Sequence, residues 1–142
     1  MKKGPTILTG TVGMDAHVIG TRIISRAFSD AGFNVIEVGI GVPPEDFIKV
    51  AQETSADAIL ISSLYGMAEM DLRGFKEQCT EAGLGDVILY IGGILAVGRH
   101  DFKDDEVKFK KMGFDRVYPP GAELEPAIEN LKNDLKAKGK ML

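Results

Sequence analysis

The feature that most constrains the fold is a set of short apolar segments separated by stretches with helical spacing. Residues 58–63 begin Ala-Ile-Leu-Ile, and residues 87–91 read Val-Ile-Leu-Tyr-Ile, with no alternation of apolar and polar side chains. Strands of this kind are buried on both faces, as in a parallel sheet covered by helices. Further β-type runs at residues 6–12, 34–39 and 116–118 bring the expected number of strands to five.

Helical patterns fill the gaps between these runs. The expected helices span residues 17–31, 43–54, 72–82, 107–112 and 124–135. Glycines follow several of them at the usual C-terminal position, and the lysine-rich residues 132–140 are expected to complete the last helix rather than bind a partner. The order predicts an α/β domain with five βα units. Its expected architecture is a doubly wound, five-stranded parallel sheet of the flavodoxin-like (Rossmann-like) type.

Composition excludes several classes of protein. Of the 142 residues, 44% are hydrophobic and 27% are charged, which is typical of a compact domain and not of a disordered or membrane-embedded chain. The length suits a single domain over residues 1–142, with its core at about 5–135. The net charge of −4 is unsuited to gripping phosphate backbones, so nucleic acid is not an expected partner. One cysteine and the lack of a signal-type cleavage site indicate the cytoplasm.

Glycine is over-represented, and many of the glycines follow the expected strands. The chain has 17 glycines in 142 residues, about 12%, against a usual ~7%. In an open parallel sheet, ligands bind beyond the carboxyl ends of the strands. The glycine-rich segments at those ends are residues 13–20, 62–66, 92–98 and 118–121. We therefore expect the functional site at this edge of the sheet.

Asp15 and His17 lie two residues apart in the first of these segments. A carboxylate at that spacing can accept the ring N–H of the imidazole, which leaves the other ring nitrogen free for a metal. In isolation, the pair is more simply interpreted as a helix cap followed by a surface histidine. Gly20, one turn beyond His17, costs the expected helix roughly 1 kcal/mol, which indicates that a ligand approaches closely.

Three other uses of this architecture fit the strand ends less well. A phosphate-accepting receiver domain needs an aspartate at the end of the third strand, where this chain has Ser62 and Ser63. A dinucleotide site needs G-x-G-x-x-G, and residues 10–13 have a different spacing. An FMN-binding flavodoxin stays open because residues 9–11 are rich in hydroxyls, although no hydroxyl run continues to the helix start.

Three of the strand-end segments together resemble a known family. Residues 15–20, 62–64 and 92–93 match the D-x-H-x-x-G, S-x-L and G-G elements of cobalamin-binding domains that take the cofactor base-off, histidine-on. Residues 13–17, 62–66 and 112–121, the last ending in Tyr-Pro-Pro-Gly, are similar to the small subunits of glutamate mutases (methylaspartate mutases). The resemblance covers nearly the whole chain, up to about residue 135.

The resemblance implies roles for individual residues. His17 would replace the cofactor's own benzimidazole as the lower ligand of cobalt, with Asp15 tuning the imidazole. Ser62 would hydrogen-bond the displaced base in a slot between the sheet and the first helix, and Ser63 and Leu64 would line that slot. The cofactor-binding residues implied in this way are Met14, Asp15, Ala16, His17, Val18, Gly20, Ser62, Ser63, Leu64, Gly92, Gly93, Ile94, Leu95, Ala96, Val97, Gly98, Tyr118 and Pro119.

The function that the resemblance implies is an isomerase component that binds adenosylcobalamin and supports the reversible radical rearrangement of L-glutamate to 3-methylaspartate. The substrate would lie on a larger subunit, in a heterotetramer, and the chain alone would be inactive. A corrinoid carrier for methyl transfer is one alternative, disfavoured because carriers usually have a helical module before the cobalamin domain, whereas the first strand here begins at Thr6. The small subunit of another cobalamin-dependent mutase, such as an acyl-CoA mutase, fits residues 62–66 and 118–121 less well.

Overall fold

Strands and helices alternate along the chain, as the sequence predicts. The computed structural model describes residues 4–12, 18–63, 68–93, 102–119 and 121–140, apart from the side chains of residues 18–21. Its strands are β1 (Thr6–Val12), β2 (Asn34–Val42), β3 (Ala58–Ser63), β4 (Ile88–Gly93) and β5 (Arg116–Tyr118). Its helices are α1 (Val18–Asp30), α2 (Pro44–Thr54), α3 (Ala68–Asp71), α4 (Phe75–Glu81), α5 (Phe102–Lys111) and α6 (Leu124–Ala137).

The strands form one parallel sheet in the order β2-β1-β3-β4-β5. This is the flavodoxin-like order, in which the chain winds outward in both directions from β1 and β3. The predicted fold class is therefore confirmed. The crevice at the β1/β3 switch point is the place where such sheets bind ligands.

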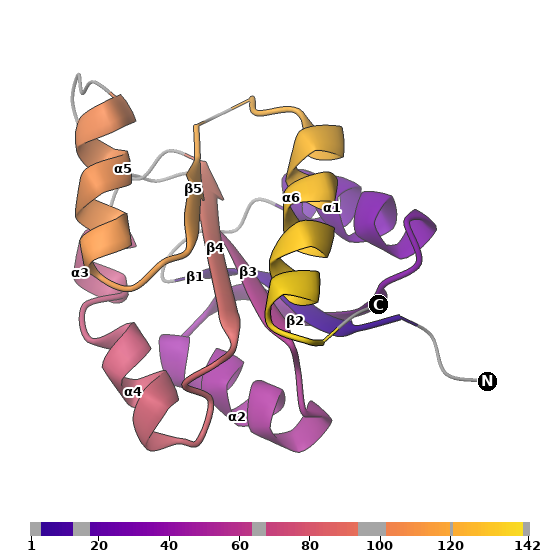
Figure 1. Ribbon diagram of the computed structural model, residues 1–142. Coiled ribbons are helices and arrows are strands. Elements are labelled where there is room, and N and C mark those ends of the chain that lie inside the picture. The colour runs from indigo at the N-terminus through magenta and orange to yellow at the C-terminus, as the bar shows by residue number, and fades with distance from the viewer. Residues whose placement is uncertain (1–3, 13–17, 64–67, 94–101, 120, 141–142) are drawn as a thin grey trace.

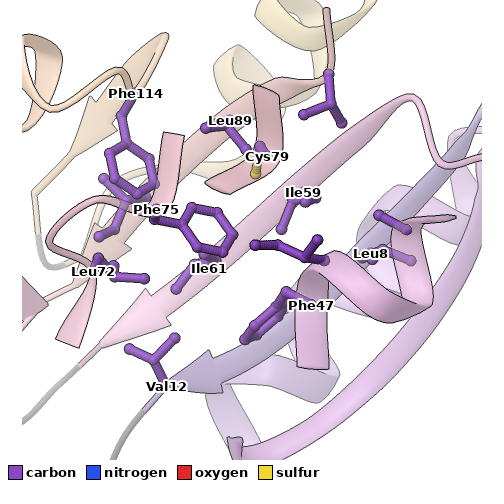
Figure 2. Packing of buried hydrophobic residues seen from close by; sticks show 14 of the residues in the cluster. Leu8, Val12, Phe47, Ile59, Ile61, Leu72, Phe75, Cys79, Leu89 and Phe114 are labelled. Carbon is purple, nitrogen blue, oxygen red and sulfur yellow. The ribbon is translucent and has the colours of Figure 1, made fainter. Parts of the chain in front are cut away.

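Helices cover both faces of the sheet, which explains why the strands are apolar throughout. In Figure 1, α1 and α6 lie on one face, and α2, α4 and α5 lie on the other. Under α1 and α6, Phe28 and Leu131 pack with alternate sheet residues such as Leu60. The opposite face holds the larger cluster, in which Figure 2 shows Phe47 and Phe75 over the sheet. Each central strand thus contributes to two apolar cores.

Cys79 belongs to the second of these cores. Its side chain is fully buried in α4, and Figure 2 shows it beside Leu89. Burial raises the pKa of the thiol to about 11, so the group stays protonated at neutral pH. The residue therefore serves packing.

The helix expected at residues 72–82 is wrong in its bounds. Residues 72–74 form a turn after α3, and the helix in this range, α4, begins only at Phe75, after Gly74. Gly74 has a φ of +77°, in the left-handed region that interrupts a right-handed helix. The apolar spacing on its own does not reveal this break, because Leu72 and Phe75 are both buried on the same core.

The C-terminal segment ties the last helix to the opposite edge of the sheet from the carboxyl ends. Helix α6 continues to Ala137, and beyond it the Lys140 ammonium lies 3.6 Å from Asp57 Oδ1 and 3.5 Å from Asp86 Oδ2. The lysines here complete and anchor the helix. No helix within the described ranges is long and apolar enough to span a membrane.

Gly10 of β1 offers a test of how tightly the larger core is packed. A Cβ at this position would lie 2.8 Å from the carbonyl oxygen of Gly39 and 3.0 Å from the ring of Phe47. We expect Gly10→Ala to lower the free energy of unfolding by about 1–3 kcal/mol, the usual cost of overpacking. Chemical denaturation measures the effect. Gly85→Ala is the control, since a Cβ there meets Thr80 at an ordinary 3.8 Å; an equal loss in both variants would contradict the packing argument.

Candidate functional site

Four residues form a row across the carboxyl edge of the sheet. Thr11 of β1 pairs with Ser62 of β3, Ser62 with Gly92 of β4, and Gly92 with Tyr118 of β5. Side chains alternate between the faces of a strand, so register partners in this row share a face. That face is the one covered by α1 and α6. The register therefore brings together residues more than one hundred positions apart in the chain.

A pocket of about 310 Å³ lies over this row, between the sheet and helices α1 and α6. It occupies the region for which the resemblance implies a slot. Most of the residues around it are apolar, and the polar side chains among them are few. Its lining consists of Thr11, Ile23, Ile24, Phe28, Leu60, Ile61, Ser62, Tyr90, Ile91, Gly92, Gly93, Tyr118, Pro119, Gly121, Ala122, Glu123, Leu124 and Ala127.

Helix α1 is held to the sheet beneath this pocket by a buried hydrogen bond. Thr9 Oγ1 of β1 and Ser25 Oγ of α1 lie 2.8 Å apart, and both side chains are buried. A buried hydroxyl pair of this kind fixes the position of the helix along the strand, because either group left alone would lose its partner. The bond places Ile24 and Phe28, its neighbours on α1, at the pocket.

Two tyrosines form the wall of the pocket on the β4 and β5 side. The rings of Tyr90 and Tyr118 lie 5.6 Å apart between centroids, at an interplanar angle of 56°. Burial raises the pKa of both phenols, most strongly that of Tyr90, so both remain protonated at neutral pH. The wall is therefore aromatic and uncharged.

The floor of the pocket is backbone at Gly92 and Gly93. A Cβ at Gly92 would contact Tyr118 Cβ at 3.4 Å, so a larger side chain has to extend elsewhere. Gly93 has a φ of +102°, a conformation that other residues rarely adopt. The two glycines thus contribute differently: Gly92 leaves the floor of the pocket without a side chain, and Gly93 adopts a backbone conformation that other residues rarely adopt.

The structure brings together only some of the residues predicted for the site. Those around the pocket are Ser62, Gly92, Gly93, Tyr118 and Pro119. Val18 and Gly20 lie in the first turn of α1, where side chains are not described. Met14, Asp15, Ala16, His17, Leu64, Ile94, Leu95, Ala96, Val97 and Gly98 lie outside the described residues.

Ser63 is not placed at the pocket. It follows Ser62 in β3, and successive side chains of a strand point to opposite faces. Ser63 therefore points to the face of Ile59 and Ile61, where it is fully buried, and its Oγ has no hydrogen-bond partner among the described residues. The expectation that Ser63 lines the slot disagrees with this placement, because Ser62 and Ser63 are neighbours in the sequence but their side chains lie on opposite faces of the sheet.

Lining residues that the sequence does not predict come from several elements, β4 and α6 among them. Tyr90 lies two positions before Gly92, so strand periodicity would place it on the same face. Leu124 and Ala127 lie in the helix that the sequence predicts over residues 124–135, with no expected role in the site. No signal in the sequence shows that this helix packs beside α1 and closes the pocket.

The described residues include no group of three or more His, Cys, Asp or Glu side chains that could hold a metal. Both histidines of the chain, His17 and His100, lie outside those residues. The described part of the site is thus a pocket with a largely apolar lining.

Comparison with known proteins places this pocket in a family context. The family model of the B12 binding domain matches residues 5–129. The glutamate mutase sigma subunit of Carboxydothermus hydrogenoformans is 53% identical over 133 residues, which are 94% of this chain and 97% of that protein. The glutamate mutase sigma subunit of Clostridium tetani is 50% identical over the same proportions.

A solved structure shares the fold at lower sequence similarity. The cobalamin-binding protein from Desulfitobacterium hafniense superimposes with a TM-score of 0.73 and 22% identity, covering 92% of this chain and 58% of that one. At 22% identity, that likeness supports the fold alone. The family model and the relatives at 50% identity or more also show the family. The chain therefore belongs to the B12 binding domain family and, within it, to the glutamate mutase sigma subunits.

Proposed function

We propose that this chain is the adenosylcobalamin-binding small subunit of a glutamate mutase and that it binds the cofactor base-off, with His17 as the lower ligand of cobalt. The observation that supports this most directly is the pocket over the Thr11–Ser62–Gly92–Tyr118 row. It lies at the same edge of the sheet at which β1 ends, five residues before His17.

The pocket suits part of the cofactor, its nucleotide tail. At about 310 Å³ it is at the small end of ligand pockets, enough for a planar heteroaromatic base and too small for a corrin ring. Tyr90, Tyr118 and Phe28 offer aromatic faces for such a base. The backbone floor at Gly92 and Gly93 lets the base approach the sheet closely.

Ser62 is the polar group that we assign to the base. It is partly exposed at the end of β3 and lines the pocket, so its hydroxyl can hydrogen-bond a ring nitrogen. Ser62 is one of the few polar side chains in a largely apolar lining, and a small number of such groups orients a ligand without a large desolvation cost. This assignment separates Ser62 from Ser63, which points to the other face of the sheet.

Asp15 and His17 complete the proposed site on the sequence evidence. An imidazole is a suitable ligand for cobalt, and a carboxylate two residues away can fix the ring's orientation and raise its basicity. When bound, adenosylcobalamin supplies a carbon radical through homolysis of its cobalt–carbon bond. This chain's residues hold and orient the cofactor and keep its displaced base away from the metal.

The partner that this proposal requires is a larger subunit that carries the glutamate site. One edge of a 142-residue domain can cover only one face of a corrin ring. A radical reaction needs the other face enclosed as well, because solvent would quench the intermediate. We propose a heterotetramer of the two kinds of subunit, located in the cytoplasm.

The test is reconstitution. We expect 3-methylaspartate to form when the purified chain is mixed with a glutamate mutase large subunit, adenosylcobalamin and L-glutamate. Its formation is measured by deaminating it to an unsaturated acid, which absorbs in the ultraviolet. Leaving out any one protein should abolish turnover. Turnover by this chain and the cofactor alone, at a rate comparable with the complex, would contradict the proposed division between subunits.

A further inference from the structure

The tyrosine wall of the pocket is supported from behind by helix α6. Tyr90 donates its phenolic proton to Asp134 Oδ2 at 2.5 Å, and Asn130 Nδ2 donates to the Tyr118 hydroxyl at 3.1 Å. Asn130 and Asp134 are four residues apart, so they lie on the same face of α6. One helix face therefore binds both hydroxyl groups of the wall.

Asp134 is itself held by Arg116 of β5. Arg116 Nε donates to Asp134 Oδ2 at 2.8 Å and Nη2 donates to Oδ1 at 3.0 Å. Two parallel hydrogen bonds of this type fix the plane of the carboxylate, whereas a single hydrogen bond would leave it free to rotate. The guanidinium also holds the pKa of Asp134 below its ordinary value, so the carboxylate is an acceptor at neutral pH.

This ion pair lies outside the pocket that Tyr90 lines. Arg116 and Asp134 border a separate cavity of about 200 Å³, and neither lines the larger pocket. Arg116 is the register partner of Tyr90 on the neighbouring strand, so the ion pair lies beside the buried tyrosine and outside the pocket. The pair acts on the Tyr90 ring directly, through the hydrogen bond from the phenol to Asp134.

We infer that Asp134 and Arg116 are positioning residues that hold the Tyr90 ring against Tyr118, so that the aromatic wall is formed before the base of the cofactor enters. This inference rests on the proposed function. Tyr90 is only 3% exposed, and a buried phenol that loses its acceptor moves or reorients to recover a hydrogen bond. A wall fixed in advance lowers the ordering cost of binding.

The experiment measures cobalamin binding by the full chain with isothermal titration calorimetry. Asp134→Asn keeps the size of the side chain but weakens both contacts, and Tyr90→Phe removes only the hydroxyl. We expect each to raise Kd about tenfold, equivalent to ~1.4 kcal/mol. Because both changes break one route, the double variant should bind no more weakly than the weaker single variant.

Glu129→Gln is the matched control. It removes the ion pair between Glu129 and Lys132 of the same helix, in which the charged atoms lie 3.9 Å apart. The exposed Glu129 side chain does not contact the tyrosines, so the Kd should stay unchanged. In the free protein, nuclear Overhauser effects between the Tyr90 and Tyr118 rings should weaken in Asp134→Asn and stay unchanged in Glu129→Gln. A purely structural role would lower thermal stability without changing these contacts between the rings or the Kd.

Three outcomes decide between the ideas. Unchanged cobalamin affinity in Asp134→Asn and Tyr90→Phe overturns the positioning role while leaving the proposed function intact. If the losses of cobalamin affinity in the two single variants add in the double variant, Asp134 does not act through Tyr90. Absence of cobalamin binding by the wild-type chain, alone and with a large subunit, overturns the proposed function itself and the inference with it. Tyr90→Phe retains the Arg116–Asp134 pair, so it tests the role even where Asp134→Asn does not fold.

Discussion

Replacement of His17 by alanine is expected to reduce turnover of the reconstituted complex by more than about 100-fold. Loss of a group that only orients a metal-bound histidine costs about 10–100-fold, and removal of the ligand itself should cost more. Asp15→Asn is therefore expected to fall within that 10–100-fold range. It keeps the size of the side chain and removes the charge that would raise the basicity of the imidazole.

Electron paramagnetic resonance of the Co(II) form tests the ligand directly. Protein labelled with nitrogen-15 histidine should show coupling to one histidine nitrogen, and the coupling should vanish in His17→Ala. His100→Ala is the control, because it is the other histidine of the chain and should keep the signal. Coupling from the cofactor's own benzimidazole in the wild-type protein would contradict base-off binding.

Gly92→Val is expected to weaken cobalamin binding by roughly 10–100-fold while the domain stays folded. A Cβ at Gly92 already contacts Tyr118 Cβ at 3.4 Å, so the two methyl groups of valine have to extend into the pocket. Overpacking of about 1–3 kcal/mol corresponds to this loss of affinity. Valine is a good strand residue, so β4 itself should form.

The decisive comparison for Gly92→Val is between binding and folding. Calorimetric titration should show the higher Kd, and far-ultraviolet circular dichroism should match that of the wild type. Gly92→Ala adds only the Cβ and should give a smaller loss. Equal affinity in the wild type and Gly92→Val would show that the base does not lie over this part of the sheet.

The sequence was a good guide wherever a feature is local. The sequence predicts β3 with its observed bounds, Ala58–Ser63. A strand buried on both faces is a continuous apolar run, which is visible in the sequence without knowing the neighbouring strands. Strand β5, at Arg116–Tyr118, was predicted equally well. The bounds differ for two helices. The left-handed conformation of Gly74 delays the start of α4 to Phe75, and α5 begins at Phe102, five residues before the apolar pattern that predicts it.

The candidate site was predicted in part. Ser62, Gly92 and Tyr118 were identified by motif, and their placement in one row depends on the register between strands that are distant in sequence. Tyr90 was missed although its spacing from Gly92 contains the information. The position of Ser63 was misjudged because its side chain follows the alternation of the strand and not the motif.

By itself, the sequence determined the class of fold and the family, and it predicts the edge of the sheet that carries the candidate site. These follow from hydrophobic periodicity and from short motifs, which are properties of neighbouring residues. Only the tertiary structure decided that α6 closes the pocket and that Asp134, held by Arg116, supports Tyr90. Such contacts depend on how a helix packs against a strand. Tyr90 and Asp134 are 44 positions apart, and no local sequence pattern predicts a hydrogen bond between residues at that separation.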